Sequence, residues 1–241
     1  NVNKAFSISF AMKYVKTPYV LIVDDDTLIG DTFIPTSLLD DGYTAVAFNV
    51  MPVENKSLIN KLQVFEYRKS MVLGKELRSR TGAIGNISGA MGLYHTADLL
   101  EQARLHSGQF GGEDEQRTAL THLHGGGRGI VYTDSTVRTI PPKNLSELTK
   151  QRTLKWNLSL PEMFVIYWRI LLHPDKHYLL KTEKAYQIYI YLTDPLRMLF
   201  FWVILTKPSR MLVAYIFYLV LTFLVWLRIG RKDPLTTVIL F

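Results

Sequence analysis

The chain has 241 residues, of which 48% are hydrophobic and 20% charged, and its formal net charge is +7. This length suffices for one or two domains with a real core, and the composition excludes intrinsic disorder, which requires low hydrophobicity with high net charge. The absence of cysteine excludes disulfides, thiolate metal sites and a cysteine nucleophile in this chain. The apolar excess concentrates after about residue 161, so the two parts of the chain are taken separately.

Alternating apolar runs and helical spacings predict an α/β domain in the first 160 residues. Apolar side chains recur every three or four positions over residues 5–15, which predicts a helix, and residues 19–23 form an unbroken apolar run, typical of a strand covered on both faces. Further strands are predicted at residues 45–50, 88–94 and 130–132, and a helix at residues 97–105. This alternation favours a doubly wound parallel sheet, with ligands at the carboxyl ends of its strands.

A further helix is predicted between the second and third of these strands. Leu58, Leu62 and Phe65 recur at three- and four-residue steps and would form its apolar face. Gly74 would end this helix.

The last third of the chain predicts helices that cross a membrane. Residues 211–227 carry no charge and, with interfacial neighbours, reach the roughly 20 residues that span a bilayer core. A second candidate span, residues 186–205, contains Asp194, Pro195 and Arg197. Either Asp194 would face other protein, water or the membrane interface, or the helix would break at this point. The alternative for this segment is a buried helix of a soluble domain.

Residues 163–172 predict a helix that lies in the membrane interface, because they are too short to span a bilayer and contain Arg169. Tyr167 and Trp168 would lie at headgroup depth. Basic residues flank the predicted spans, and by the positive-inside rule the α/β domain would be cytoplasmic. These residues are Lys181, Lys184, Arg228, Arg231 and Lys232. We expect a multi-pass protein of the plasma membrane.

An acidic cluster follows the first predicted strand, where a sheet would deliver side chains to a crevice. Carboxylates are hard oxygen ligands for Mg²⁺ or Mn²⁺, and such an ion would neutralise a diphosphate leaving group. Asp24 and Asp26 are two residues apart, so in an extended chain they would point to the same side. The alternative is a solvated turn or a helix cap.

Two further motifs each have a chemical and an ordinary interpretation. Gly112-Glu113-Asp114 precedes helical spacing over residues 116–123, so Asp114 could be a general base or simply an acid favoured at a helix start. Residues 151–156 combine cations with an indole, which could bind a diphosphate and a sugar ring or form an interfacial belt.

Four motifs therefore follow one another along the chain: Asp24-Asp25-Asp26, then Ser88-Gly89-Ala90-Met91-Gly92-Leu93-Tyr94, then Gly112-Glu113-Asp114, then Gln151 to Trp156. This order, followed by interfacial and membrane helices, resembles the processive family 2 glycosyltransferases, hyaluronan and chitin synthases in particular, over nearly the whole chain. The resemblance implies an α/β, GT-A-like nucleotide-sugar-binding domain followed by interfacial and transmembrane helices.

The expected organisation has three parts. Residues 1–160 would form the C-terminal portion of the catalytic domain, residues 161–184 the interfacial helix region, and residues 185–241 about two spans and the start of a third. The chain opens one helix before a central strand and stops inside an apolar run, so we expect a piece of a longer membrane enzyme that lacks the family's uracil-binding segment.

The resemblance implies a role for each motif. Asp24 and Asp26 would hold the donor diphosphate and its metal ion, Mg²⁺ or Mn²⁺. Ser88 and Gly89 would line the acceptor site. Asp114 would be the general base that takes the proton of the acceptor hydroxyl.

The last motif would contact both substrates. Gln151, Arg152 and Lys155 would face the donor diphosphate, and Trp156 would contact the acceptor sugar. Compared with the family's Q-x-x-R-W pattern, Lys155 stands in place of Arg, and Arg152 stands four residues before Trp156, where the family has Gln.

The resemblance implies an inverting β-glycosyltransferase that uses a UDP-sugar, UDP-GlcNAc with or without UDP-GlcA, to extend a polysaccharide. The expected partners are the UDP-sugar donor, the polysaccharide acceptor and a lipid bilayer. Nucleic acid is not expected, because no basic stripe with interleaved aromatics is evident. Two alternatives stay open: a non-processive transferase that adds one sugar to a lipid-linked acceptor, and a non-catalytic membrane subunit that binds nucleotide sugars.

Overall fold

The computed structural model describes residues 4–108, 112–154, 160–205, 216 and 220. It divides the chain into two compact units, residues 1–184 and 185–241, and the candidate site lies in the first. The helices of the described part are α1 (Lys4–Ala11), α2 (Ser37–Asp40), α3 (Leu58–Lys69), α4 (Leu77–Ser79), α5 (Thr96–Leu105), α6 (Glu113–His124), α7 (Leu145–Leu154), α8 (Leu160–Leu172) and α9 (Tyr178–Leu205), with a 3₁₀ turn η1 (Met12–Tyr14) and a π-helix η2 (Ser70–Glu76).

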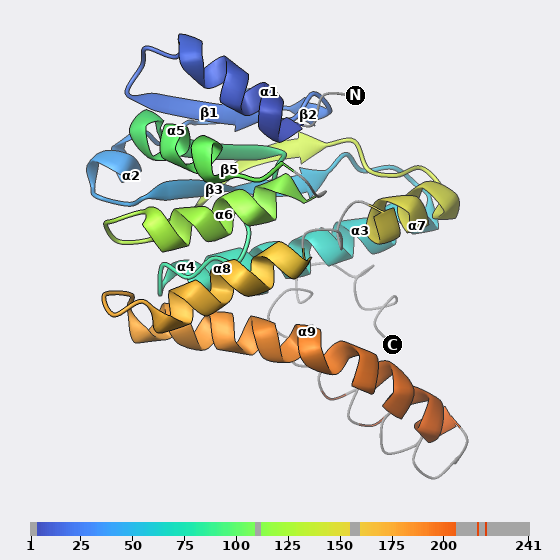
Figure 1. Ribbon diagram of the computed structural model, residues 1–241. Helices are drawn as coiled ribbons and strands as arrows, with labels where there is room; N and C mark the ends of the chain where they lie inside the picture. The colour runs from blue at the N-terminus through green and yellow to red at the C-terminus, as the bar shows by residue number, and fades with distance from the viewer. Residues whose placement is uncertain (1–3, 109–111, 155–159, 206–215, 217–219, 221–241) are drawn as a thin grey trace. The chain divides into compact units, whose positions relative to one another are not determined.

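A five-stranded mixed sheet lies at the centre of the first unit, in the order β1-β4-β3-β5-β2 (Figure 1). Its strands are β1 (Tyr19–Val23), β2 (Thr27–Leu28), β3 (Ala45–Pro52), β4 (Met91–His95) and β5 (Ile130–Thr139). The α/β class and the four predicted strands are confirmed, and β2 is an additional strand.

The expectation of a parallel sheet is wrong. β3 and β5 are parallel, but β4 runs antiparallel to both β1 and β3, and β2 runs antiparallel to β5. In the β1–β4 pair, Val23 lies opposite Met91 and Tyr19 opposite His95. An apolar run predicts a strand without predicting its direction. Here β4 begins at Met91, opposite Val23, the last residue of β1.

Two apolar clusters cover the two faces of the sheet, and β3 contributes to both because its side chains alternate. Ala45 and Ala47 pack in the cluster that includes η1 and α5, whereas Val46 and Phe48 pack in the cluster that includes α2 and η2. β1 also contacts both clusters, although Ile22 is its one fully buried residue, because β1 is an edge strand.

The predicted face of α3 and the predicted end at Gly74 are both wrong. Leu58 and Leu62 are exposed, whereas Asn60 and Gln63 are buried and their amides donate to the carbonyls of Val53 and Pro142, at 2.9 Å in each case. The helix is therefore fixed through polar contacts with loops, which apolar spacing does not reveal. It continues past Gly74 as the π-helix η2.

The helix predicted at residues 163–172 is confirmed and forms part of α8. The predicted exposure of Tyr167 at headgroup depth is wrong. Tyr167 is 1% exposed, and its ring centroid lies 4.6 Å from Nζ of Lys184, which is itself fully buried. Tyr167 therefore does not lie at headgroup depth, and Lys184 is not a free charge beside a membrane. Trp168 is exposed, and its place at an interface stays a prediction.

The predicted spans are not confirmed. In the described part of the chain, α9 included, no helix combines the length and the apolar character needed to cross a bilayer. Nearly all of residues 211–227 lie outside the described residues.

Candidate functional site

The antiparallel β4 brings the first two motifs together at the end of β1. Asp24 follows β1 directly, and its backbone N–H donates to the carbonyl of Ala90 at 3.2 Å, which extends the β1–β4 ladder. Gly89 is buried beside it: a Cβ on Gly89 would lie 3.0 Å from Oδ2 of Asp24 and 3.6 Å from Oδ2 of Asp114. The carboxylates of two separate motifs therefore converge on one glycine.

Asp114 reaches this point from the first turn of α6. Its Oδ2 accepts from the backbone N–H of Gly89 at 3.0 Å and from Nδ2 of Asn86 at 3.4 Å, and its Oδ1 accepts from the N–H of Glu115 at 3.0 Å. The Thr118 hydroxyl donates to the carbonyl of Asp114 at 2.7 Å. Asp114 is thus a helix-start acid that also contacts the predicted acceptor segment.

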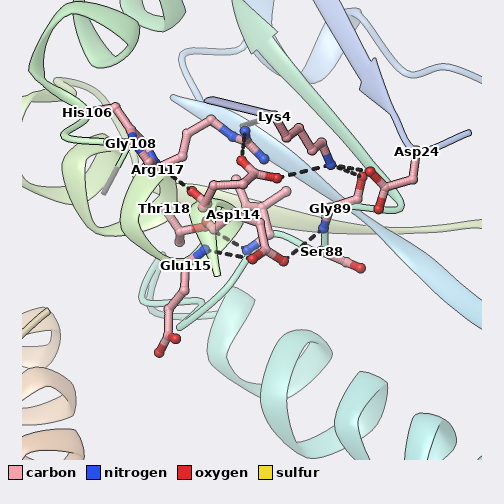
Figure 2. A network of polar contacts seen from close by, with 12 residues as sticks. Lys4, Asp24, Ser88, Gly89, His106, Gly108, Asp114, Glu115, Arg117 and Thr118 are labelled. Atoms are coloured by element: carbon pink, nitrogen blue, oxygen red, sulfur yellow. Dashed lines mark hydrogen bonds and ion pairs between the residues drawn. The ribbon is translucent and has the colours of Figure 1, made fainter. Parts of the chain in front are cut away.

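Lys4 joins the acidic groups and was not predicted as a site residue. Its Nζ forms an ion pair with Asp24, lies 3.0 Å from Oε1 of Glu113 and donates to the carbonyl of Gly89 at 3.3 Å (Figure 2). Glu113 also bonds to Arg117, with Oε2 and Nη1 2.5 Å apart. Sequence alone does not distinguish Lys4 among the 28 Lys and Arg residues, because its partners are distant in the chain.

The electrostatics of the site reflect partial burial of opposite charges. Burial alone would lower the pKa of Lys4, but the charges of Glu113 and Asp24 outweigh it and raise that pKa above the ordinary value. Burial also raises the pKa of Asp24, against the attraction of Lys4, and the nearby charge of Asp26 adds to this rise. The pair of acids would therefore gain from a further positive charge.

Asp26 is brought near Asp24 by a turn, so the expectation of an extended chain at this point is wrong. The N–H of Thr27 donates to the carbonyl of Asp24 at 3.1 Å and closes the turn. Oδ1 of Asp26 accepts from the hydroxyl of Thr139 at 3.3 Å, at the end of β5. The turn forms because β2, which follows it directly, pairs with β5.

The residues present fit a divalent ion in their donor chemistry. No group of three or more potential metal ligands occurs among the residues described here. Mg²⁺, however, is usually bound by one or two carboxylates together with water and substrate phosphates. Asp24 and Asp26 supply two carboxylates of this kind.

The predicted acceptor segment lies beside the two acids, whereas the last motif is only partly described. Ser88 is half-buried next to Gly89, and its hydroxyl accepts from the N–H of Ala90 at 3.3 Å. Gln151 and Arg152 lie in α7, and Oε1 of Gln151 is buried without a hydrogen-bond partner among the described residues. Lys155 and Trp156 lie outside the described residues.

Comparison of the sequence with protein-family models and with curated proteins finds no match. The functional argument therefore depends on the residues themselves. Asp24, Ser88, Gly89 and Asp114 meet in space, together with the cation of Lys4.

Proposed function

We propose that this chain is the catalytic part of a membrane-embedded inverting β-glycosyltransferase that transfers sugar from a UDP-sugar to the hydroxyl end of a growing polysaccharide. The supporting observation is the convergence of Asp24 and Asp114 on Gly89, since these residues belong to three motifs that the family resemblance assigns to donor, acceptor and base. Independent solvated turns and helix starts would have no reason to meet at one glycine.

Asp114 acts on the acceptor. A carboxylate has about four acceptor positions on its two oxygens, and the described donors fill two on Oδ2 and one on Oδ1. The remaining position on Oδ1 takes the proton of the acceptor hydroxyl as that oxygen attacks the anomeric carbon. The bond from this carbon to the diphosphate breaks on the opposite side, and its electron pair leaves with UDP.

Lys4, Asp24 and Asp26 act on the donor. Asp24 and Asp26 would hold Mg²⁺ or Mn²⁺, which would supply positive charge to offset the charge that develops on the leaving diphosphate. The ammonium group of Lys4 lies at the same place and binds diphosphate oxygens by charge-assisted hydrogen bonds. Lys155 adds a second cation, and Trp156 holds the acceptor sugar by its ring face.

The test is UDP release and product size from membranes that carry the full-length gene product. UDP-GlcNAc, UDP-GlcA and UDP-glucose are supplied singly and in pairs, with Mg²⁺ or Mn²⁺. High-mass polymer with released UDP supports the proposal. Release with only short products favours the single-sugar transferase, and no release from any donor contradicts catalysis by this protein.

The variant Asp114→Asn tests the base and separates it from a helix-start acid. We expect it to lower UDP release by at least about a hundredfold while UDP still binds. Asp98→Asn is the matched control, since Asp98 lies in the first turn of α5. Equal activity in the two variants would contradict the role of Asp114.

A further inference from the structure

The ammonium group of Lys4 faces three oxygens beside Asp24, the residue that follows β1 (Figure 2). Its Nζ forms an ion pair with Oδ1 of Asp24, lies 3.0 Å from Oε1 of Glu113 and donates to the carbonyl of Gly89 at 3.3 Å. An ammonium group has three N–H donors, so these three oxygens can take all of them. Two carboxylates and a carbonyl are also the oxygen ligands that a hard divalent cation takes. The charge of Lys4 therefore occupies a place that suits a cation.

Glu113 is the fixed partner of Lys4. The side chain of Glu113 is 12% exposed, and its Oε2 lies 2.5 Å from Nη1 of Arg117. Arg117 is buried, and its Nε donates to the hydroxyl of Tyr94 at 3.2 Å. Glu113 is thus held from the interior of the protein through Arg117, while its other oxygen, Oε1, contacts Lys4.

Asp24 is the more accessible partner of Lys4, since its side chain is 32% exposed. The contact between Lys4 and Asp24 can therefore open while Glu113 and the carbonyl of Gly89 still hold the ammonium group. An ammonium group in contact with one oxygen of a carboxylate repels a divalent ion on the same carboxylate. Asp24 cannot serve both cations equally well.

We propose that Lys4 competes with the divalent ion for Asp24, and that Lys4 gives up Asp24 when the donor diphosphate offers it a new partner. The inference rests on the proposed function, because it takes Asp24 as a ligand of the ion and the diphosphate as a ligand of Lys4. In the absence of donor, the ion pair with Lys4 keeps the affinity of Asp24 for the ion low. The diphosphate brings negative charge for both cations, so the ion and the donor bind together rather than separately.

The experiment measures Mn²⁺ affinity in the absence of UDP, from the electron paramagnetic resonance signal of free Mn²⁺, on the purified full-length gene product. Lys4→Met removes the charge at similar side-chain length, and Lys4→Arg keeps the charge. Lys13→Met is the control, since Lys13 is an exposed lysine in η1. A double variant, Lys4→Met with Asp24→Asn, locates any gain in affinity. UDP affinity without metal and melting temperature are measured on the same preparations.

We expect Lys4→Met to bind Mn²⁺ at least about tenfold more tightly than the wild type, because the repelling charge beside Asp24 is removed. UDP affinity without metal should fall in the same variant, so that the two ligands respond in opposite directions. Lys4→Arg and Lys13→Met should bind Mn²⁺ as the wild type does. The double variant should lose the gain.

Four results would overturn the inference. Equal Mn²⁺ affinity in Lys4→Met and the wild type would show that Lys4 does not compete with the ion. A gain that Lys13→Met shares would reflect net charge alone, and a gain that survives Asp24→Asn would place the ion elsewhere. A joint loss of Mn²⁺ affinity, UDP affinity and melting temperature in Lys4→Met would assign Lys4 to the stability of the fold.

Failure of the inference can be told apart from failure of the proposed function. The Mn²⁺ titration contains no donor, so it decides the competition at Asp24 by itself. A wild type that releases no UDP from any donor would contradict the proposed function, whatever the Mn²⁺ titration shows.

Discussion

Replacement of Lys75 by Met should make the protein more stable. Burial lowers the pKa of Lys75 from the ordinary 10.5 to about 8, and this difference of roughly 2.5 pKa units corresponds to about 3 kcal/mol. The folded protein binds the proton of Lys75 less tightly than the unfolded chain does. The destabilisation is therefore complete below about pH 8, and the free energy of unfolding rises with pH between about 8 and 10.5.

Chemical unfolding of wild type and Lys75→Met at two pH values measures this effect. We expect Lys75→Met to be more stable by about 3 kcal/mol at neutral pH and by less than about 1 kcal/mol near pH 10, because the wild-type lysine is then largely neutral in both states. Groups that titrate equally in both proteins cancel in the difference. Lys69→Met should show no gain at either pH, since Lys69 is exposed.

A less stable Lys75→Met at neutral pH would refute the reasoning, since it would mean that Lys75 stabilises the fold through its charge. A gain that does not change with pH would also refute it, because the gain would then come from packing.

The donor end of the site gives three further predictions. Lys4→Met should weaken UDP affinity at least about fivefold in a calorimetric titration, because it removes the cation between Asp24 and Glu113. Lys13→Met is the control, since Lys13 is exposed, and it should leave UDP affinity unchanged. Equal affinities in the two variants would contradict the role of Lys4. Gly89→Ala should lower UDP release at least about tenfold with little change in melting temperature. The new Cβ would lie 3.0 Å from Oδ2 of Asp24 and 3.1 Å from Nζ of Lys4, which are movable ends of side chains. Release at the wild-type rate would show that the site tolerates a methyl group. Burial raises the pKa of Asp24 above the ordinary 3.8, so this carboxylate is protonated at a higher pH than an exposed one. On acidification, UDP affinity in the presence of Mg²⁺ should therefore begin to decline at that higher pH. Asp24→Asn should remove this decline, and an unchanged decline in the variant would assign it to another group.

Strands and the order of motifs could be predicted from the sequence, because apolar runs and acidic clusters are local features. Tyr19–Val23 was predicted to the residue, and Asp24, Gly89 and Asp114 do meet. The buried face of α3 could not be predicted, since Asn60 and Gln63 lie on it beside Val64, whereas Leu58 and Leu62 are exposed.

The cations of the site could not be predicted either. Lys4 pairs with Asp24 and Glu113, which are distant in the chain, and Lys75 is buried in the π-helix η2. A buried lysine has no sequence signature, because lysines are usually exposed and helical spacing does not set them apart. The converging acids could therefore be recognised from sequence motifs, whereas the positive charge beside them could be recognised only from the three-dimensional structure.

The direction of β4 decides between two expectations that cannot both hold. A strand of five residues spans roughly 17 Å. If β4 ran parallel to β1, its start would lie beside Tyr19, and the segment at Gly89 would be about one strand length away from Asp24. The family resemblance instead implies that the donor and acceptor motifs share one site. The antiparallel pairing of Val23 with Met91 brings Gly89 to the end of β1, beside Asp24, as one shared site would require. Apolar periodicity could not supply this arrangement, because an apolar run predicts a strand without its direction.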